Sequence, residues 1–191
     1  NYETNQKFFG DIYNPQGFFP PEMCYSKRLA EILQKIGFKW VIIDEIAYNG
    51  KLNQLKNNVI YHIDGIKNFD VFFKERHYSA GITYGKYENG QEFIKNLGNS
   101  VNENFYLLTG TDGEIYGHHR AGQELLLSEI FNNNRIQTCT ISELYDLFDQ
   151  SAVVDPLSSS WSTWEDEMVD NIPYPQWKYP KNEIHFFQWE L

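Results

Sequence analysis

Two carboxylates on short motifs rich in glycine and aromatic residues are the side chains best suited to chemistry in this chain. Glu22 lies in GFFPPE, and Asp112 lies in TGTDGE. A retaining glycosidase needs such a pair about 5 to 5.5 Å apart, one carboxylate as the nucleophile and the other as the acid/base. The nucleophile must be ionised while the acid begins protonated, so the surroundings of the two carboxylates must differ. Their separation along the chain says nothing about whether they meet in space.

A second group of polar residues surrounds Asp112. Glu114, His118 and His119 follow it within eight positions, after an apolar run and before an amphipathic one. A strand, a polar cluster and a helix in this order form a βα unit whose chemistry lies at the carboxyl end of the strand. The simpler alternative is a solvated loop whose acidic residues suit the dipole at a helix N-terminus, and it applies equally to Glu22.

The elements that must position these residues alternate between strands and helices. Short apolar runs predict strands, and apolar residues on one helical face predict helices. The predicted strands are 38–43, 59–63, 71–73, 105–109, 136–140 and 153–154, and the predicted helices are 26–36, 91–101, 121–131 and 143–148. Residues 81–87 are expected to form a short strand or an irregular piece. Residues 157–191 change in composition and predict an aromatic-rich loop and a terminal segment of the same domain.

This alternation predicts an α/β fold with parallel strands, arranged as a barrel. A length of 191 residues allows one domain with a substantial core, so residues 1–191 are expected to form a single domain. In a barrel the strand ends converge, and the Glu22 and Asp112 motifs would meet there. Asp44 ends the predicted strand 38–43, and Arg76 follows the strand 71–73, so both are candidates for the same edge.

Composition and charge exclude several kinds of partner. The formal net charge is −10, which argues against nucleic acid and against an anionic membrane, because both need basic patches. No apolar run approaches the roughly 20 residues of a membrane span. Cys24 and Cys139 are too few and too far apart for a disulfide or metal framework, so reduced thiols and a cytoplasmic location are expected. No cofactor and no metal are expected. Aromatic residues make up 17% of the chain, which suits sugar stacking and also an ordinary aromatic core.

Four segments, taken together, resemble the family-57 glycoside hydrolases, which act on α-glucans. GFFPPEMCYSKRLAEILQKIGFKWVIIDE resembles the nucleophile region of that family, and TGTDGEIYGHH resembles its next region, Asp-(Gly/Ala)-Glu-x-(Phe/Tyr)-Gly-His. FFKERHYSAGI resembles the stretch between them, and SSSWS resembles a later segment whose tryptophan lines the sugar subsites. The order of the segments is that of the family, and the resemblance extends over most of the chain, roughly residues 17–161.

The resemblance implies a retaining hydrolase or transglycosylase that acts on α-1,4-glucans through a glycosyl-enzyme intermediate. Glu22 would be the nucleophile and Asp112 the acid/base. The substrate-binding residues implied or suggested beside them are Phe19, Asp44, Arg76, Glu114, His118, His119 and Trp161. Phe19 stands where the family usually has tryptophan, which makes one stacking surface smaller.

The resemblance also implies a seven-stranded (β/α) barrel that is incomplete in this chain. The family's opening strand, with its His-Gln-Pro motif, is absent from the sequence. Barrels of this kind usually need about 250 residues. A barrel that lacks strands exposes two strand edges, which proteins normally cover. We therefore expect an incomplete barrel, a trimmed fragment, or a barrel completed by another chain or segment.

Two other functions remain open at this point. A metal-dependent hydrolase of the polysaccharide deacetylase kind would use Asp112, His118 and His119 as ligands. Neighbouring histidines at a helix start point about 100° apart, which argues against one shared metal. The other alternative is a non-catalytic remnant that binds carbohydrate without turnover, and the presence of both carboxylates argues against it.

Overall fold

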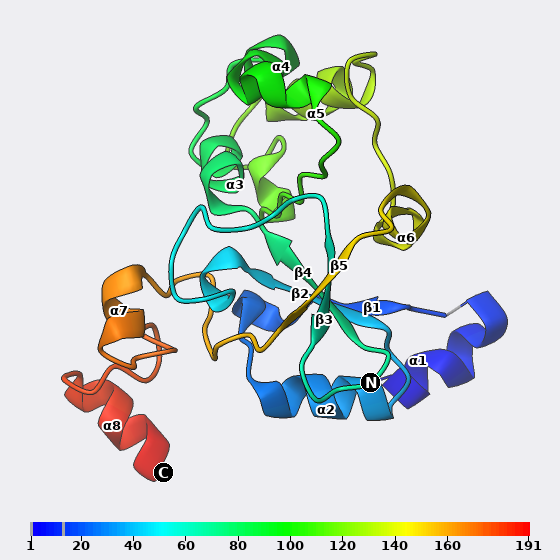
Figure 1. Ribbon diagram of the computed structural model, residues 1–191. Coiled ribbons are helices and arrows are strands. Elements are labelled where there is room, and N and C mark those ends of the chain that lie inside the picture. Colours follow the sequence, from blue (N-terminus) through cyan, green and yellow to red (C-terminus); the bar gives the residue numbers. More distant parts are fainter. Residues whose placement is uncertain (1, 13) are drawn as a thin grey trace.

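A five-stranded sheet organises the chain in the computed structural model, which describes residues 2–12 and 14–191 (Figure 1). The predicted domain 1–191 therefore includes residues 1 and 13, which lie outside the described part. The strands are β1 (Gly17–Phe18), β2 (Trp40–Asp44), β3 (Ile60–Ile63), β4 (Asp70–Lys74) and β5 (Ser151–Val154). Their order across the sheet is β1-β2-β4-β3-β5.

The directions of the strands decide where side chains gather. β1, β2 and β4 are parallel neighbours, so their carboxyl ends share one edge, where Asp44 stands opposite Lys74. β3 runs antiparallel to β4 and parallel to β5. The sheet is therefore mixed: most strand pairs are parallel, as expected, and the pair β3–β4 is antiparallel. The connection from β3 to β4 is a short turn around Gly65, and a turn of that length can join only antiparallel strands.

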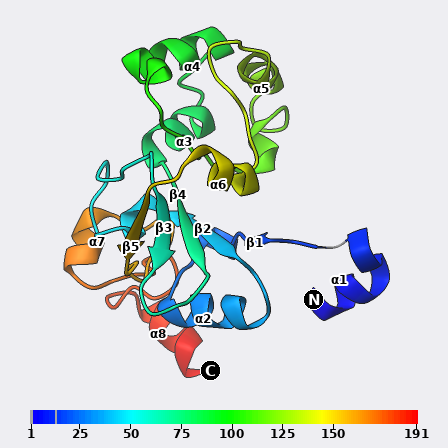
Figure 2. The same ribbon diagram turned by 45° about the vertical axis from the view of Figure 1, so that its right-hand side comes forward.

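α2 and the group α3, α4 and α5 lie at opposite ends of the sheet, as both ribbon views show (Figures 1 and 2). α2 lies near the amino ends of β1 and β2, while α3, α4 and α5 gather beyond the carboxyl end of β4. The helices are α1 (Tyr2–Phe9), α2 (Lys27–Lys35), α3 (Arg76–Thr83), α4 (Gly90–Leu97), α5 (Gln123–Phe131), α6 (Leu144–Leu147), α7 (Glu165–Val169) and α8 (Glu183–Glu190). No helix of the described residues is long and apolar enough to cross a membrane.

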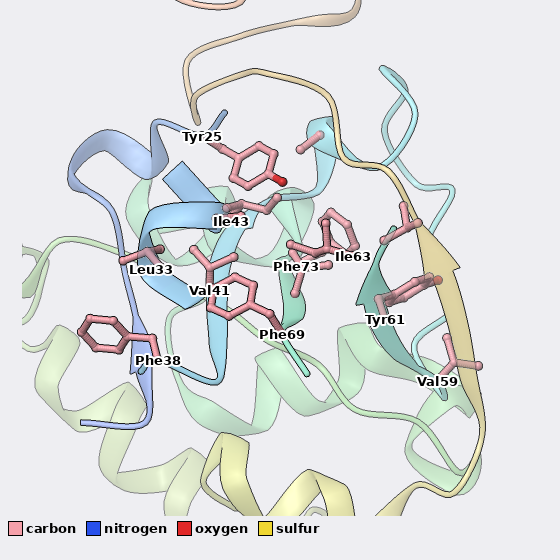
Figure 3. Packing of buried hydrophobic residues seen from close by; sticks show 14 residues of the cluster. Tyr25, Leu33, Phe38, Val41, Ile43, Val59, Tyr61, Ile63, Phe69 and Phe73 are labelled. Atoms are coloured by element: carbon pink, nitrogen blue, oxygen red, sulfur yellow. The ribbon is translucent and has the colours of Figure 1, made fainter. Parts of the chain in front are cut away.

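The largest core lies between α2 and the central strands (Figure 3). The Ser26 hydroxyl begins α2 by accepting a hydrogen bond from the Leu29 backbone N–H, the usual role of an N-cap serine. Leu33 on α2 then packs with Val41 and Ile43 of β2, which are fully or almost fully buried. This burial fixes the position of β2 and therefore of its last residue, Asp44.

Gly17 allows β1 to lie directly beside Trp40 of β2. A Cβ atom at position 17 would stand 2.0 Å from Trp40 Cε3, far inside van der Waals contact. Only glycine fits against the indole there. The close approach places Phe19 and the Glu22 turn next to the carboxyl end of β2.

Several predicted elements are wrong, although most of the others are confirmed. Residues 105–109 and 136–140 are irregular segments and not strands, and residues 81–83 belong to the end of α3. The predicted loop and terminal segment 157–191 contains two helices, α7 and α8. Residues 105–109 still run beside the sheet, because Leu108 C=O accepts from the Glu75 N–H and the Tyr106 N–H donates to Asn57 C=O.

Candidate active site

Glu22 lies in a tight turn that follows β1. The turn, Pro21–Met23, is a single 3-10 turn, and the φ angle of Glu22 is 57°, a left-handed conformation that costs a non-glycine residue free energy. The side chain is exposed to solvent, and its Oε2 accepts a hydrogen bond of 2.7 Å from Trp161 Nε1. The Glu22 carbonyl oxygen also accepts from the Trp161 backbone N–H at 3.1 Å. The first hydrogen bond orients the Glu22 carboxylate, and the second ties the backbone of the turn to Trp161.

The segment that carries Trp161 is tied to the Glu22 turn through the backbone. The Tyr25 N–H donates to Ser159 C=O at 2.8 Å, and the Ser159 N–H donates back to Tyr25 C=O at 3.2 Å. Ser159 and Ser160 are fully buried. The SSSWS motif is thus a fixed part of the site wall.

The Asp112 loop passes close to the same turn. A Cβ atom at Gly110 would lie 3.2 Å from the Lys74 side chain and 3.4 Å from Met23 Cε, so glycine permits this approach. Asp112 follows two residues later, at the N-terminal end of a 3-10 turn (Gly113–Ile115), and is exposed. The loop carrying one candidate carboxylate therefore touches the turn that carries the other.

A buried ionic cluster supports this edge of the sheet. Asp44 is fully buried, and its carboxylate pairs with Lys74 Nζ at 3.1 Å and with Arg76 Nη2 at 2.5 Å. Its Oδ1 also accepts from the Ile46 N–H at 3.1 Å. Lys74 and Arg76 are both more than nine-tenths buried. Asp44 therefore holds two cations in place, and its contact with substrate stays a prediction.

The same two cations reach the tryptophans of the segment 159–164. Lys74 Nζ lies 5.5 Å from the centre of the Trp161 ring, and the Arg76 guanidinium lies 4.9 Å from that of Trp164. Arg76 Nη1 donates to Thr163 C=O at 2.8 Å. Cations within about 6 Å of a ring are attracted to its electron-rich face. A chain of contacts therefore runs from Asp44 through Lys74 to Trp161 and Glu22.

Three residues of this edge were missed by the sequence prediction: Lys74, Glu45 and Glu75. Glu45 is buried, and its carboxylate accepts from the Arg76 N–H at 2.7 Å and the Asn53 N–H at 2.8 Å. Burial raises the pKa of Glu75, and the charge of Glu45 adds to the rise. The signal in the sequence was the acidic or basic residue directly after each apolar run, which marks where a strand ends.

Glu114, His118 and His119 lie on the surface of the turn before α5. All three are exposed, and the His119 N–H donates to Glu114 C=O at 2.8 Å. The two imidazoles stack, with ring centres 4.7 Å apart and planes 14° from parallel. The expectation of divergent rings at a helix start is wrong, because α5 begins only at Gln123. Among the described residues, no group of three or more His, Cys, Asp or Glu side chains is arranged to hold a metal ion.

Comparison with known protein families identifies the family of this chain. Residues 2–156 match the model of glycosyl hydrolase family 57. The chain belongs to this family. A comparison with curated proteins found no match.

Solved structures with a similar fold include three enzymes, each less than 20% identical to this family 57 chain. A branching enzyme of the family from Thermococcus kodakaraensis has a TM-score of 0.75 at 14% identity, and the match covers 99% of this chain. A maltose-forming amylase from Pyrococcus sp. ST04 has a TM-score of 0.69 at 18% identity over 96% of this chain. The 4-α-glucanotransferase from Thermococcus litoralis has a TM-score of 0.62 at 17% identity over 83% of this chain.

This family 57 chain spans only part of those proteins. The matches cover 48% of the branching enzyme, 35% of the amylase and 25% of the glucanotransferase. The predicted fold class, α/β with a partial (β/α)7-type barrel, is confirmed by these matches and by the mostly parallel sheet.

The geometry brings some of the predicted site residues together. Glu22 and Trp161 are in direct contact, and Asp44 and Arg76 form an ion pair. Phe19 follows β1 and is 47% exposed, which leaves its ring available to a ligand.

Proposed function

We propose that this family 57 chain carries the two catalytic carboxylates of a retaining glycoside hydrolase or transglycosylase that acts on α-1,4-glucans. The observation that carries this proposal is the hydrogen bond between Trp161 Nε1 and Glu22 Oε2. It joins the proposed nucleophile to the tryptophan that is proposed to stack on a sugar. The approach of Gly110 to Met23 supports the pairing of Glu22 with Asp112.

The reaction would proceed by two displacements. Glu22 attacks the anomeric carbon, while Asp112 gives its proton to the departing glycosidic oxygen, so a Glu22 ester forms as the glycosidic bond breaks. Asp112 then accepts a proton from an acceptor hydroxyl, whose oxygen displaces Glu22 from the anomeric carbon. Water as the acceptor gives hydrolysis, and a sugar hydroxyl gives transglycosylation.

The surroundings suit a neutral, ring-shaped substrate. Trp161 contacts Glu22, and Phe19 lies three residues before it with its ring 47% exposed. Pyranose rings offer apolar C–H faces to such aromatic surfaces. Trp161 holds the Glu22 carboxylate in one orientation before substrate arrives, which lowers the entropic cost of attack. Exposed Glu114, His118 and His119 are proposed to contact substrate around the Asp112 loop.

The similar structures favour an α-glucan as substrate. They are described as a branching enzyme, a 4-α-glucanotransferase and amylases. These reactions have an α-glucan donor in common and differ in the acceptor. We further propose that residues 1–191 act as one part of a catalytic barrel, which another chain or segment completes.

Substitution of each carboxylate tests this function. In the purified protein that carries this chain, Glu22→Gln is expected to abolish release of sugar from maltoheptaose while glucan binding is retained. Asp112→Ala should be slow with natural glucan but faster with a substrate whose leaving group needs no proton, such as a glycosyl fluoride. Glu190→Gln on the exposed face of α8 is the matched control and should leave turnover unchanged.

The products in azide distinguish the two roles. Azide replaces a lost nucleophile and yields a glycosyl azide of inverted configuration, whereas loss of the acid/base yields one of retained configuration. We expect the inverted product from Glu22→Ala and the retained product from Asp112→Ala. Wild-type turnover rates in Glu22→Gln would show that the nucleophile lies elsewhere.

A further inference from the structure

A polar cavity lies next to the buried ionic cluster, beyond the carboxyl ends of β2 and β4. It has a volume of about 450 Å³, and its lining includes Glu45, Glu75, Tyr78 and Phe105. Neither Glu22 nor Asp112 lines it. Glu45 and Glu75 each follow the last residue of a strand, directly after Asp44 of β2 and Lys74 of β4. The cavity volume falls within the roughly 300 to 1,000 Å³ of small-molecule sites.

One wall of the cavity, residues 53–58, is fixed by hydrogen bonds to the sheet. The Asn53 N–H donates to Glu45 Oε2 at 2.8 Å, and the Lys56 N–H donates to the Tyr61 hydroxyl at 2.9 Å. The Tyr61 hydroxyl also donates to Lys56 C=O at 3.2 Å. Such a wall needs little ordering when a ligand binds, which favours affinity.

The opposite wall comes from α3 and the segment after α4. The Glu75 carboxylate accepts from the backbone N–H groups of His77 and Tyr78 at 2.8 and 2.6 Å and so begins α3. The Tyr78 hydroxyl donates to Asn96 C=O at 3.2 Å, and its ring contacts Phe93 edge to face. The aromatic ring is therefore held in position from both ends.

The lining contains side-chain amides that a ligand can reach from solvent. Asn53, Asn57, Asn58 and Asn104 line the cavity, and their side-chain amides make no hydrogen bond to another described residue. Each amide offers two donors and an acceptor. The carboxylates of Glu45 and Glu75 accept one backbone N–H at each oxygen and retain further lone pairs. The lining therefore contains both donors and acceptors.

The charges of the lining disfavour charged ligands. Glu45, Glu75 and Glu103 outnumber the single cation, Lys56, which repels anions from a partly buried site. Among the described residues, no group of three or more carboxylate, imidazole or thiol side chains is arranged for a metal ion. A neutral molecule with many hydroxyl groups matches such a lining, because each hydroxyl donates and accepts. The Tyr78 and Phe105 rings add surface for its apolar faces.

We propose that this cavity is a saccharide-binding site separate from the catalytic pair. The ligand class, a neutral sugar, follows from the lining. The more specific assignment of this sugar as an α-1,4-glucan rests on the proposed function. A sugar bound in the cavity would contact Glu45, which accepts a hydrogen bond from the Arg76 N–H. The Arg76 guanidinium pairs with Asp44, so binding in the cavity is expected to affect the ionic cluster beside the active site.

Binding is best measured in the Glu22→Gln protein, where turnover does not consume the sugar. Maltotriose is titrated while the side-chain amide NMR signals of asparagine are followed. We expect the signals of the four cavity asparagines to shift together with one affinity, while that of exposed Asn134 stays constant. Cellotriose and glucose 1-phosphate are titrated in parallel to test linkage and charge.

The double substitution Asn58→Ala with Asn104→Ala removes two amides that make no hydrogen bond to another described residue. We expect it to weaken maltotriose binding at the cavity by about tenfold and to leave the thermal midpoint unchanged. Asn134→Ala is the control. An absence of shifts with every neutral sugar, or stronger shifts with glucose 1-phosphate, would overturn the cavity assignment. Shifts with cellotriose alone would support a sugar site but not an α-glucan site. Turnover of maltoheptaose by the wild-type protein tests the proposed catalytic function independently of the cavity.

Discussion

Trp161 donates its indole N–H to the Glu22 carboxylate at 2.7 Å, although 139 positions separate the two residues in the chain. The contact depends on the backbone pairing of Tyr25 with Ser159, which brings the SSSWS segment against the turn after β1. The geometry of the proposed nucleophile is thus set by a segment from the far end of the chain.

Replacing Trp161 by phenylalanine tests this contact. The change keeps an aromatic ring but removes the N–H donor, and a hydrogen bond to a charged group contributes about 1.5 to 3 kcal/mol. We expect Trp161→Phe to lower kcat by roughly 10- to 100-fold. Trp189→Phe is the matched control, because its indole N–H also donates at 2.7 Å but to Trp177 C=O near α8. Equal kcat in Trp161→Phe and wild type would contradict the role of the contact.

The buried charge of Asp44 is expected to dominate the stability of this edge of the sheet. Asp44→Asn leaves Lys74 and Arg76 buried without their counter-charge, which costs about 3 to 5 kcal/mol. Urea denaturation should therefore show a large fall in the free energy of unfolding. Asp155→Asn removes the exposed pair with Lys27 and should change it little. Similar effects of the two substitutions would show that the buried cluster is not a stabilising device.

Gly17 is expected to tolerate no side chain. A Cβ atom there would overlap Trp40 Cε3 at 2.0 Å, and forced overpacking typically costs about 1 to 3 kcal/mol. Gly17→Ala should lower the free energy of unfolding by at least that amount. Gly113→Ala is the control, since no atom lies within 4 Å of its added Cβ. A second substitution, Trp40→Leu, should recover part of the loss, and strict additivity of the two changes would argue against the clash.

The raised pKa of Glu75 predicts a pH dependence of stability. Burial raises the pKa above the usual value of 4.5, so the folded state binds a proton that the unfolded state has already released. The contribution of Glu75 is therefore unfavourable once it ionises: stability falls as the pH rises from the usual pKa through the raised one. Urea denaturation across this window should show a shallower fall in Glu75→Gln than in wild type. An equally steep fall in the variant would assign it to other groups.

The central elements were predictable because local pattern and tertiary packing agree there. Residues 26–36 combine an N-cap serine with one apolar face, and α2 forms as expected. β2 and β4 coincide with their apolar runs. The apolar pattern of residues 105–109 indicated partial burial, because Tyr106, Leu107 and Leu108 pack against neighbouring hydrophobic clusters. It did not indicate whether this segment pairs with a strand.

α3 shows why other elements were missed. Its sequence, RHYSAGIT, has weak helix formers, but the Glu75 carboxylate satisfies two backbone N–H groups at its start. Gly81 is required because a Cβ atom there would lie 2.5 Å from the Tyr87 ring. Both features depend on contacts with residues outside the helix, and the hydrophobic periodicity of the helix sequence does not indicate such contacts.

Sequence motifs indicate candidate members of the site, but they do not indicate its geometry. The motifs indicated Glu22, Asp112 and Trp161, whereas the left-handed conformation of Glu22 and its hydrogen bond to Trp161 depend on tertiary contacts. The sequence also gave no sign that Asp44 is fully buried between two cations.

Trapping of the glycosyl-enzyme tests the central claim most directly. The protein is incubated with a 5-fluoro glucosyl fluoride, which forms the covalent intermediate faster than it breaks down, and the digested peptides are examined by mass spectrometry. Glu22 displaces the anomeric fluoride and the fluorine on C5 remains, so the account predicts one added 5-fluorohexosyl mass on the peptide that contains Glu22. The same label should be missing in Glu22→Gln. A label on another carboxylate, or turnover of glucan with no labelled peptide, would contradict it.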